Sequence, residues 1–244
     1  MKITKTVKTI LASIAGIVLI ATCLLSYVAF NNWQIARTMQ AAKESAINKE
    51  KEATKEFIAA YSEWLNLRDP NFIEIERLND EYEKLNETYA EANKTADFQT
   101  VENQATPMIN NLNVTKTALE NSLTFKKNNE NPIVERVNTK ALAISNKKKK
   151  KVGLQIKENI RKTNLLEIEK IETQLKWVDS NKKWLETYTA SGLERSGSTE
   201  AWTEELHGYY SIAFDSGVKE NEISKELTEL INESNQLFKE FKSL

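Results

Sequence analysis

Hydrophobic side chains recur every three or four residues along most of the chain after residue 52. This spacing places them on one face of a helix, and an average near 3.5 residues is typical of helices that pack in coiled-coil fashion. The clearest stripes run through residues 53–67, 75–92, 101–119, 168–188 and 223–241. The pattern therefore predicts an all-α protein in which residues 53–244 form an elongated antiparallel helical bundle with coiled-coil packing.

The positions of proline and glycine predict where these helices begin and end. Each proline follows a residue that can cap a helix, in Asp69-Pro70, Thr106-Pro107 and Asn131-Pro132, so each pair predicts a helix start. The last of these helices is expected either to run unbroken to about Ala190 or to break near the sequence NKKKKKVG. Pairs of serine and glycine mark turns nearer the carboxyl end.

The longest apolar run, ILASIAGIVLIATCLLSYVAF, covers residues 10–30 and holds no charged side chain. At about 1.5 Å per residue it matches a bilayer core of roughly 30 Å, so we expect a transmembrane signal-anchor helix. Lys2, Lys5 and Lys8 precede it, which by the positive-inside rule predicts a short cytoplasmic segment 1–9 and a domain outside the cytoplasm. Residues 31–52 are helix-prone but poor in large apolar side chains, and we interpret them as a helical stalk.

Cys23, the only cysteine, raises the alternative that the chain is cut there and lipid-anchored. The preceding Ile20-Ala21-Thr22 only partly matches the pattern that bacterial lipoprotein processing needs, and Leu24 to Phe30 continue the apolar run. We favour the intact anchor. Lipid attachment at Cys23 and ordinary secretion after cleavage stay open.

Composition supports the helical interpretation and narrows the function. The chain has six glycines, three prolines and a net charge of −1, which suits long helices and gives no reason to expect nucleic acid as a partner. Lysine far outnumbers arginine and asparagine is abundant, a bias that we associate with AT-rich bacterial genomes. No cysteine follows Cys23, so neither disulfides nor a thiolate metal site are expected in the bundle.

No pattern of residues predicts catalysis. His207 is the only histidine, and Cys23 lies inside the apolar run, so a nucleophile with a histidine base would depend on His207 alone. The chain has no zinc, calcium, phosphate-loop or dinucleotide motif. We therefore expect no enzyme, no cofactor, no metal and no catalytic residue.

Two local features are candidates for binding. Residues 131–162 hold ten basic and two acidic side chains around a lysine run that can bind anionic wall polymers or lipid headgroups, namely Lys147, Lys148, Lys149, Lys150 and Lys151. The same run also fits a solvated helix face, or a segment paired with the acidic carboxyl-terminal region. Aromatic side chains gather nearer the carboxyl end, where they fit a partner-binding patch or a core between helices: Trp177, Trp184, Trp202, Tyr209 and Tyr210, with Tyr188 and Phe214 beside them.

Taken together, these features predict a bacterial single-pass membrane protein that presents a helical interaction or structural module outside the cytoplasm. Its expected partner is another envelope protein or a second copy of itself. The bundle also resembles, at the level of architecture, the periplasmic bundles of chemoreceptors, which makes ligand sensing an alternative. Binding of anionic wall polymers is another.

Overall fold

The computed structural model describes the backbone of residues 5–95, 98–190 and 199–244, and the side chains of residues 22, 24–94, 100–189 and 203–244. Every regular element in these ranges is a helix, which confirms the predicted all-α class. The chain divides into two compact units, Met1–Glu52 and Ala53–Leu244.

The first unit is the initial part of helix α1, which spans Lys5–Asn66. Its described side chains from Leu24 to Lys49 are exposed, including the ring pair Phe30 and Trp33, whose centroids are 6.0 Å apart. Across the described residues, no helix contains a stretch that is both long and apolar enough to cross a membrane. Most side chains of the predicted span 10–30, Cys23 among them, lie outside the described residues.

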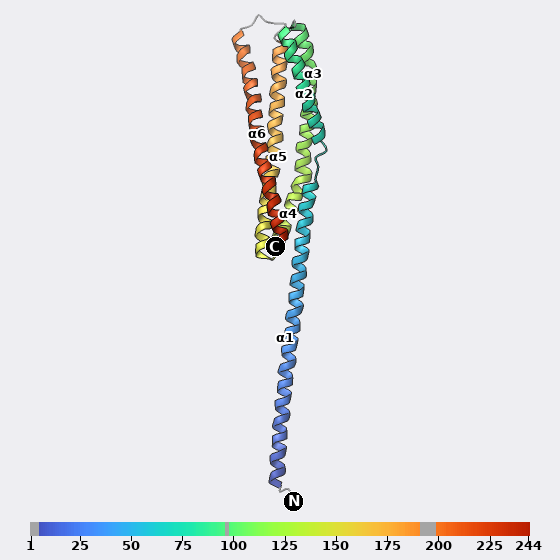
Figure 1. The fold of residues 1–244 in the computed structure, drawn as a ribbon, viewed down its shortest axis with the longest axis vertical. Coiled ribbons are helices and arrows are strands. Elements are labelled where there is room, and N and C mark those ends of the chain that lie inside the picture. Colours follow the sequence, from blue (N-terminus) through green and yellow to red (C-terminus); the bar gives the residue numbers. More distant parts are fainter. Residues whose placement is uncertain (1–4, 96–97, 191–198) are drawn as a thin grey trace. The chain divides into compact units, whose positions relative to one another are not determined.

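The second unit is a bundle of helices aligned along one axis (Figure 1). After the end of α1 it contains α2 (Phe72–Thr95), α3 (Phe98–Phe125), the π-helical turn η1 (Lys126–Glu130), α4 (Asn131–Ala143), α5 (Lys147–Ala190) and α6 (Thr199–Ser243). Helices α5 and α6 have 44 and 45 residues. At 1.5 Å per residue each is roughly 66 Å long, so this unit is elongated.

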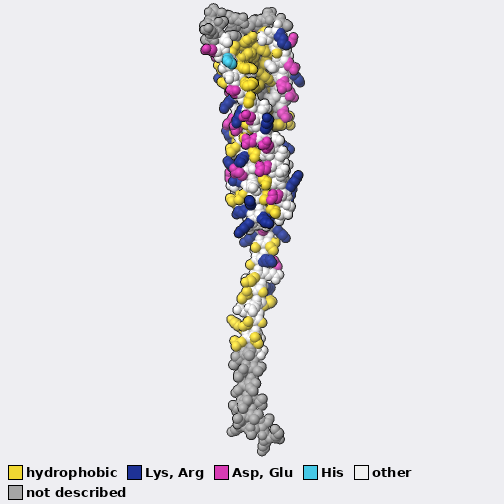
Figure 2. Space-filling view, turned by 60° about the vertical axis from the view of Figure 1, so that its left-hand side comes forward, with side chains coloured by type: hydrophobic (Ala, Val, Ile, Leu, Met, Phe, Trp, Pro, Cys, Tyr) yellow, Lys and Arg dark blue, Asp and Glu magenta, His cyan; other side chains and the backbone are white. Residues whose placement is uncertain are grey.

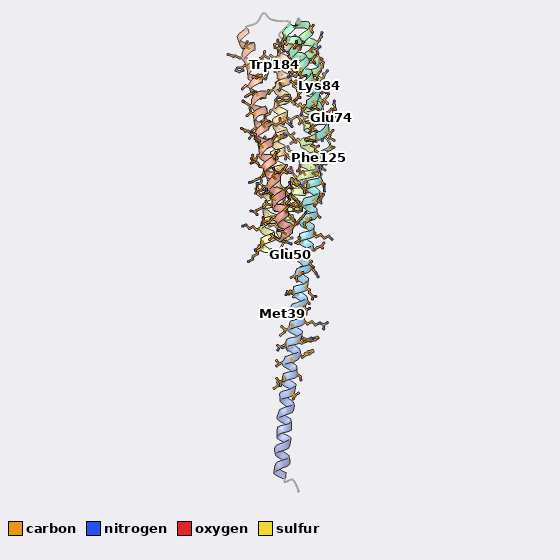
Figure 3. All side chains as sticks on the ribbon, in the orientation of Figure 1. Met39, Glu50, Glu74, Lys84, Phe125 and Trp184 are labelled. Atoms are coloured by element: carbon orange, nitrogen blue, oxygen red, sulfur yellow. The ribbon has the colours of Figure 1, made fainter. Side chains whose placement is uncertain are left out.

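Four rods make up the bundle, because α3, η1 and α4 follow one another without a break and together run antiparallel to α5. The ion pairs Lys116–Asp179 and Lys126–Glu167 and the hydrogen bond between Asn131 and Asn164 mark this antiparallel alignment. The other rods are the part of α1 from Ala53 onward followed by α2, then α5, and finally α6. Phe125, labelled in Figure 3, lies about midway along the bundle, where α3 passes into η1.

Two apolar cores fill different halves of the bundle. The core near the carboxyl terminus joins α1, α4, α5 and α6, and within it the ring centroids of Phe57 and Phe241 are 4.7 Å apart. The core at the other end joins α2, α3 and α5, with Leu112, Val178 and Leu185 almost fully buried. Among the described side chains, α6 contributes to the first core and not to the second.

The predicted stripes contribute to both cores, although the core residues of α4 and of the first part of α5 lie outside them, and the helix starts need correction. Asp69 does open α2, since its carboxylate accepts a hydrogen bond from the Asn71 amide at 2.9 Å and the helix begins at Phe72. The predicted start at Thr106-Pro107 is wrong, because Pro107 lies inside α3. The apolar stripe from Val101 to Leu112 is buried on both sides of the proline, and this burial offsets the one backbone hydrogen bond that proline cannot donate.

The expected helix from Pro132 also differs in detail. Pro132 occupies the first turn of α4, but α3 and η1 run directly into that turn. The break falls at residues 144–146, where Ile144 adopts an extended conformation with ψ of 126°. Asn146 then starts α5, since its side-chain oxygen accepts from the amides of Lys148 and Lys149 at 3.0 and 3.1 Å.

Candidate functional site

In the half of the bundle near the carboxyl terminus, two faces of helix α6 are covered by other helices. In the other half only one face is covered. Near the carboxyl terminus, Phe238 packs on Tyr61 of α1 with ring centroids 4.4 Å apart. Towards the other end α6 packs along α5, and its described side chains take no part in the core of α2, α3 and α5. A second apolar stripe on α6 is therefore left exposed in that half.

This exposed stripe and the neighbouring part of α5 form an open groove of about 360 Å³. Tyr210, Phe214 and Val218 follow one another at intervals of four residues and are 59%, 61% and 45% exposed. Figure 2 shows hydrophobic side chains gathered on this face near one end of the bundle. We call this feature the α5–α6 groove; its lining is Trp177, Asn181, Tyr210, Ala213, Phe214, Gly217, Val218 and Asn221.

Gly217 helps to make the groove concave. A methyl group added at its Cα would meet no atom within 4 Å, so the space above this residue is open. Glycine lowers the stability of a helix interior by about 1 kcal/mol relative to alanine. The backbone conformation does not require it, because no described glycine has a positive φ.

The structure divides the aromatic side chains that the sequence grouped together. Trp184, labelled in Figure 3 near the end of α5, stacks on Tyr188 at 5.2 Å and belongs to the core region with Tyr89. Trp177 packs edge-on against Tyr82 of α2 and also lines the groove. Tyr210 lies in the groove, whereas the side chain of Trp202 lies outside the described residues.

Tyr209 lies next to the groove rather than in it. Its hydroxyl donates a hydrogen bond to the Glu205 carboxylate at 2.8 Å, and the ammonium of Lys183 lies 5.9 Å from its ring centroid. The hydrogen bond to Glu205 raises the pKa of the Tyr209 hydroxyl. The contact with Lys183 links Tyr209 of α6 to α5, and Tyr209 is not among the residues that line the groove.

The outer edge of the groove is acidic. At 100° per residue, Glu204, Asp215 and Glu222 of α6 lie along the side of the exposed stripe that faces away from α5. All three are exposed, and no ion pair between described residues involves them. On the inner side, by contrast, Lys170 and Lys219 form ion pairs with Glu220 and Glu169 across the α5–α6 contact.

The predicted lysine cluster lies at the amino-terminal end of α5. Lys149 and Lys150 are half-buried there: the Lys149 ammonium lies 5.9 Å from the Phe241 ring centroid, and the Lys150 ammonium donates to the Leu142 carbonyl at 2.7 Å. Lys147, Lys148 and Lys151 are exposed. Figure 2 shows Lys and Arg side chains gathered at this end of the bundle, opposite the α5–α6 groove. The structure therefore brings part of the cluster into the fold and leaves three lysines free of the core.

A buried charged cluster at the π turn was missed by the sequence reasoning. The Lys126 ammonium lies 2.8 Å from Glu130 and 2.7 Å from Glu167, and the indole of Trp64 donates to Glu130 at 2.9 Å. Only 5% of the Glu130 side chain is exposed. Burial raises the pKa of Glu167, against the opposing effect of Lys126. This cluster joins α1, η1 and α5 between the two apolar cores.

The described residues offer no arrangement that holds a metal, since no group of three or more His, Cys, Asp or Glu side chains converges among them. His207 is exposed on α6. The sequence predicted three residues of the groove and missed the other five, namely Asn181, Ala213, Gly217, Val218 and Asn221. Val218 could have been found from its four-residue spacing from Phe214. The turn predicted at Ser216-Gly217 is wrong, because both residues lie inside α6.

We found no match for this chain among models of protein families, curated proteins or solved structures. The groove and its charged edge are therefore interpreted from their own chemistry.

Proposed function

We propose that this chain is a bacterial single-pass membrane protein that presents a helical bundle outside the cytoplasm, and that the bundle binds a partner protein through the α5–α6 groove. The membrane anchor rests on the apolar run 10–30 and the lysines before it. The binding role rests on one observation: Tyr210, Phe214 and Val218 form a continuous exposed apolar stripe beside Trp177. A soluble protein surface rarely exposes such a stripe unless it is an interface.

The shape of the groove favours a protein partner over the alternative of a small sensed ligand. Pockets for small molecules enclose most of the ligand surface, whereas this groove is open along its length and its main apolar side chains are about half exposed. A helix laid along the groove can cover the stripe without enclosure. Binding of anionic wall polymers is less favoured, because two of the five lysines make contacts within the fold.

Site-specific photocrosslinking in native membranes tests this function. A benzophenone amino acid at position 214 should form a crosslink to one defined protein species on illumination, because that position lies in the groove. The matched control is position 72, where Phe72 is similarly exposed at 58% but lies outside the groove lining.

The crosslink at position 214 should be lost when Val218→Asp places a charge in the groove. Equal crosslinking at positions 214 and 72, or none at 214, would contradict the proposed binding role.

A further inference from the structure

We infer that the occupant of the α5–α6 groove is an amphipathic helix of a partner protein with an apolar face and a basic edge. This inference rests on the proposed binding function and adds the chemistry of the partner. Its basis is the juxtaposition of the stripe Tyr210, Phe214 and Val218 with the carboxylates of Glu204, Asp215 and Glu222.

The apolar part of the groove fits a helix in length and direction. From Tyr210 to Asn221 the lining follows three turns of α6, roughly 16 Å along the axis. Its walls are two helices whose backbone groups are already paired within each helix, so an extended strand would find no free backbone edge to pair with. Side chains at intervals of three and four residues on a partner helix can alternate with Tyr210, Phe214 and Val218.

The charge of the groove edge selects the kind of helix. The three carboxylates have no ion pair within the described residues and are spaced along the full length of the stripe. Lys or Arg on the facing edge of a partner helix would pair with them, as basic and acidic side chains do at the edges of coiled coils. A partner helix with an acidic edge would be repelled by the three carboxylates.

The same charges disfavour two other occupants. An antiparallel pair of α6 helices from two copies of this chain would bring Glu204 of one against Glu222 of the other. A membrane surface rich in anionic lipid would also be repelled by this edge. The apolar stripe alone would fit either occupant, so the three carboxylates carry the choice.

Two synthetic helical peptides of about 20 residues test the inference against the full chain in nanodiscs of zwitterionic phosphatidylcholine. Both peptides carry leucine on one face; one has lysine and the other glutamate on the flanking edge. Fluorescence anisotropy should show the lysine-edged peptide binding at least about tenfold more tightly, since three surface ion pairs of modest strength act together. This preference should shrink at about 1 M NaCl, where the Debye length is roughly 3 Å. Empty nanodiscs provide the blank.

Variants of the chain test the acidic edge and the groove itself separately. Reversing the edge with Glu204→Lys, Asp215→Lys and Glu222→Lys should invert the preference towards the glutamate-edged peptide. Phe214→Glu should abolish binding of either peptide, while Phe72→Glu, at a similarly exposed position outside the groove, should leave it unchanged. Circular dichroism and the thermal midpoint check that each variant is folded.

Each outcome has a defined meaning. Equal affinity for the two peptides, or an unchanged preference in the edge-reversed variant, would overturn the basic-edge inference and leave the groove as a binding site. Affinity that Phe214→Glu does not reduce would count against the groove itself. A concentration-dependent dimer of the chain that Phe214→Glu dissociates would replace the partner helix by a second copy.

Discussion

Glu167 is a partly buried carboxylate in the charged cluster at the π turn. It shares the single ammonium of Lys126 with Glu130, and Lys126 lies 2.7 Å from it. Burial raises the pKa of Glu167, and the nearby Glu130 acts in the same direction. A carboxyl group in this position takes up a proton at a higher pH in the folded chain than in the unfolded chain.

The consequence is a specific pH dependence of stability. Above the ordinary carboxyl pKa of about 4.3, the folded state binds more protons at Glu167 than the unfolded state does. The contribution of Glu167 to the free energy of unfolding is therefore complete below about pH 4.3. It is lost as the pH rises through the pKa of Glu167 in the folded state. Glu167→Gln removes the titration. Its free energy of unfolding, measured by urea titration, should therefore increase relative to the natural chain from about pH 4 to about pH 7.

Glu172→Gln on the exposed face of α5 serves as the control and should leave the pH profile unchanged. A constant difference between Glu167→Gln and the natural chain at every pH would contradict the prediction.

At the scale of single helices, the sequence predicted apolar stripes better than it predicted helix caps. The stripe through Val101 and Leu112 was recognisable, because burial repeats at helical spacing. Pro107 inside this stripe was mistaken for a helix start, because Thr106-Pro107 has the residue types of a helix cap. In the structure the Thr106 hydroxyl instead donates a hydrogen bond to the Glu102 carbonyl at 3.5 Å within the helix. Local signals compete here with packing that the sequence does not show.

The start of α5 gives a testable case of a cap. Asn146 accepts hydrogen bonds from two amides at the helix start, so Asn146→Ala should lower the free energy of unfolding by about 1 kcal/mol. Asn146→Asp keeps an acceptor and adds a negative charge at the helix amino terminus beside Lys147 and Lys148, so it should lose no stability. Urea denaturation of the three chains measures both effects. Equal losses for Ala and Asp would show that the side-chain acceptor is not what stabilises this end.

At the scale of the whole molecule, the sequence was enough for the helical class and for part of the core, but the buried residues of α4 and of the first part of α5, such as Val137 and Ile156, lie outside the predicted stripes. Phe57, Leu112 and Phe241 were all in predicted stripes and are all buried. The groove was only half predicted: Tyr210 and Trp177 were named, but their aromatic character did not distinguish them from Trp184, which packs in the core region. Side-chain spacing alone does not show which of the two apolar stripes on α6 meets another helix.

The orientation of the protein in the membrane, with the bundle outside the cytoplasm, can be tested in intact cells. Val114 is 49% exposed on α3, so Val114→Cys in a Cys23→Ser background should react with a membrane-impermeant maleimide in intact cells if the bundle lies outside the cytoplasm. Reaction only after permeabilisation would refute the orientation inferred from Lys2, Lys5 and Lys8.

The intact mass of the natural chain decides the remaining alternative, because lipid attachment at Cys23 would remove the preceding residues and add acyl chains. An unprocessed mass supports the intact anchor.

The contact between Phe57 and Phe241 has a consequence for the order of folding. These rings come from the first and the last helix of the bundle, so their contact joins residues much farther apart in the sequence than the contacts within the α4–α5 and α5–α6 hairpins do. Closing the longest loop costs the most chain entropy, so hairpins such as α4–α5 and α5–α6 can form before the two ends of the bundle meet. The core that contains Phe57 and Phe241 is then completed only when the last turns of α6 pack against α1 and α4, so this part of α6 is the closing element of the bundle.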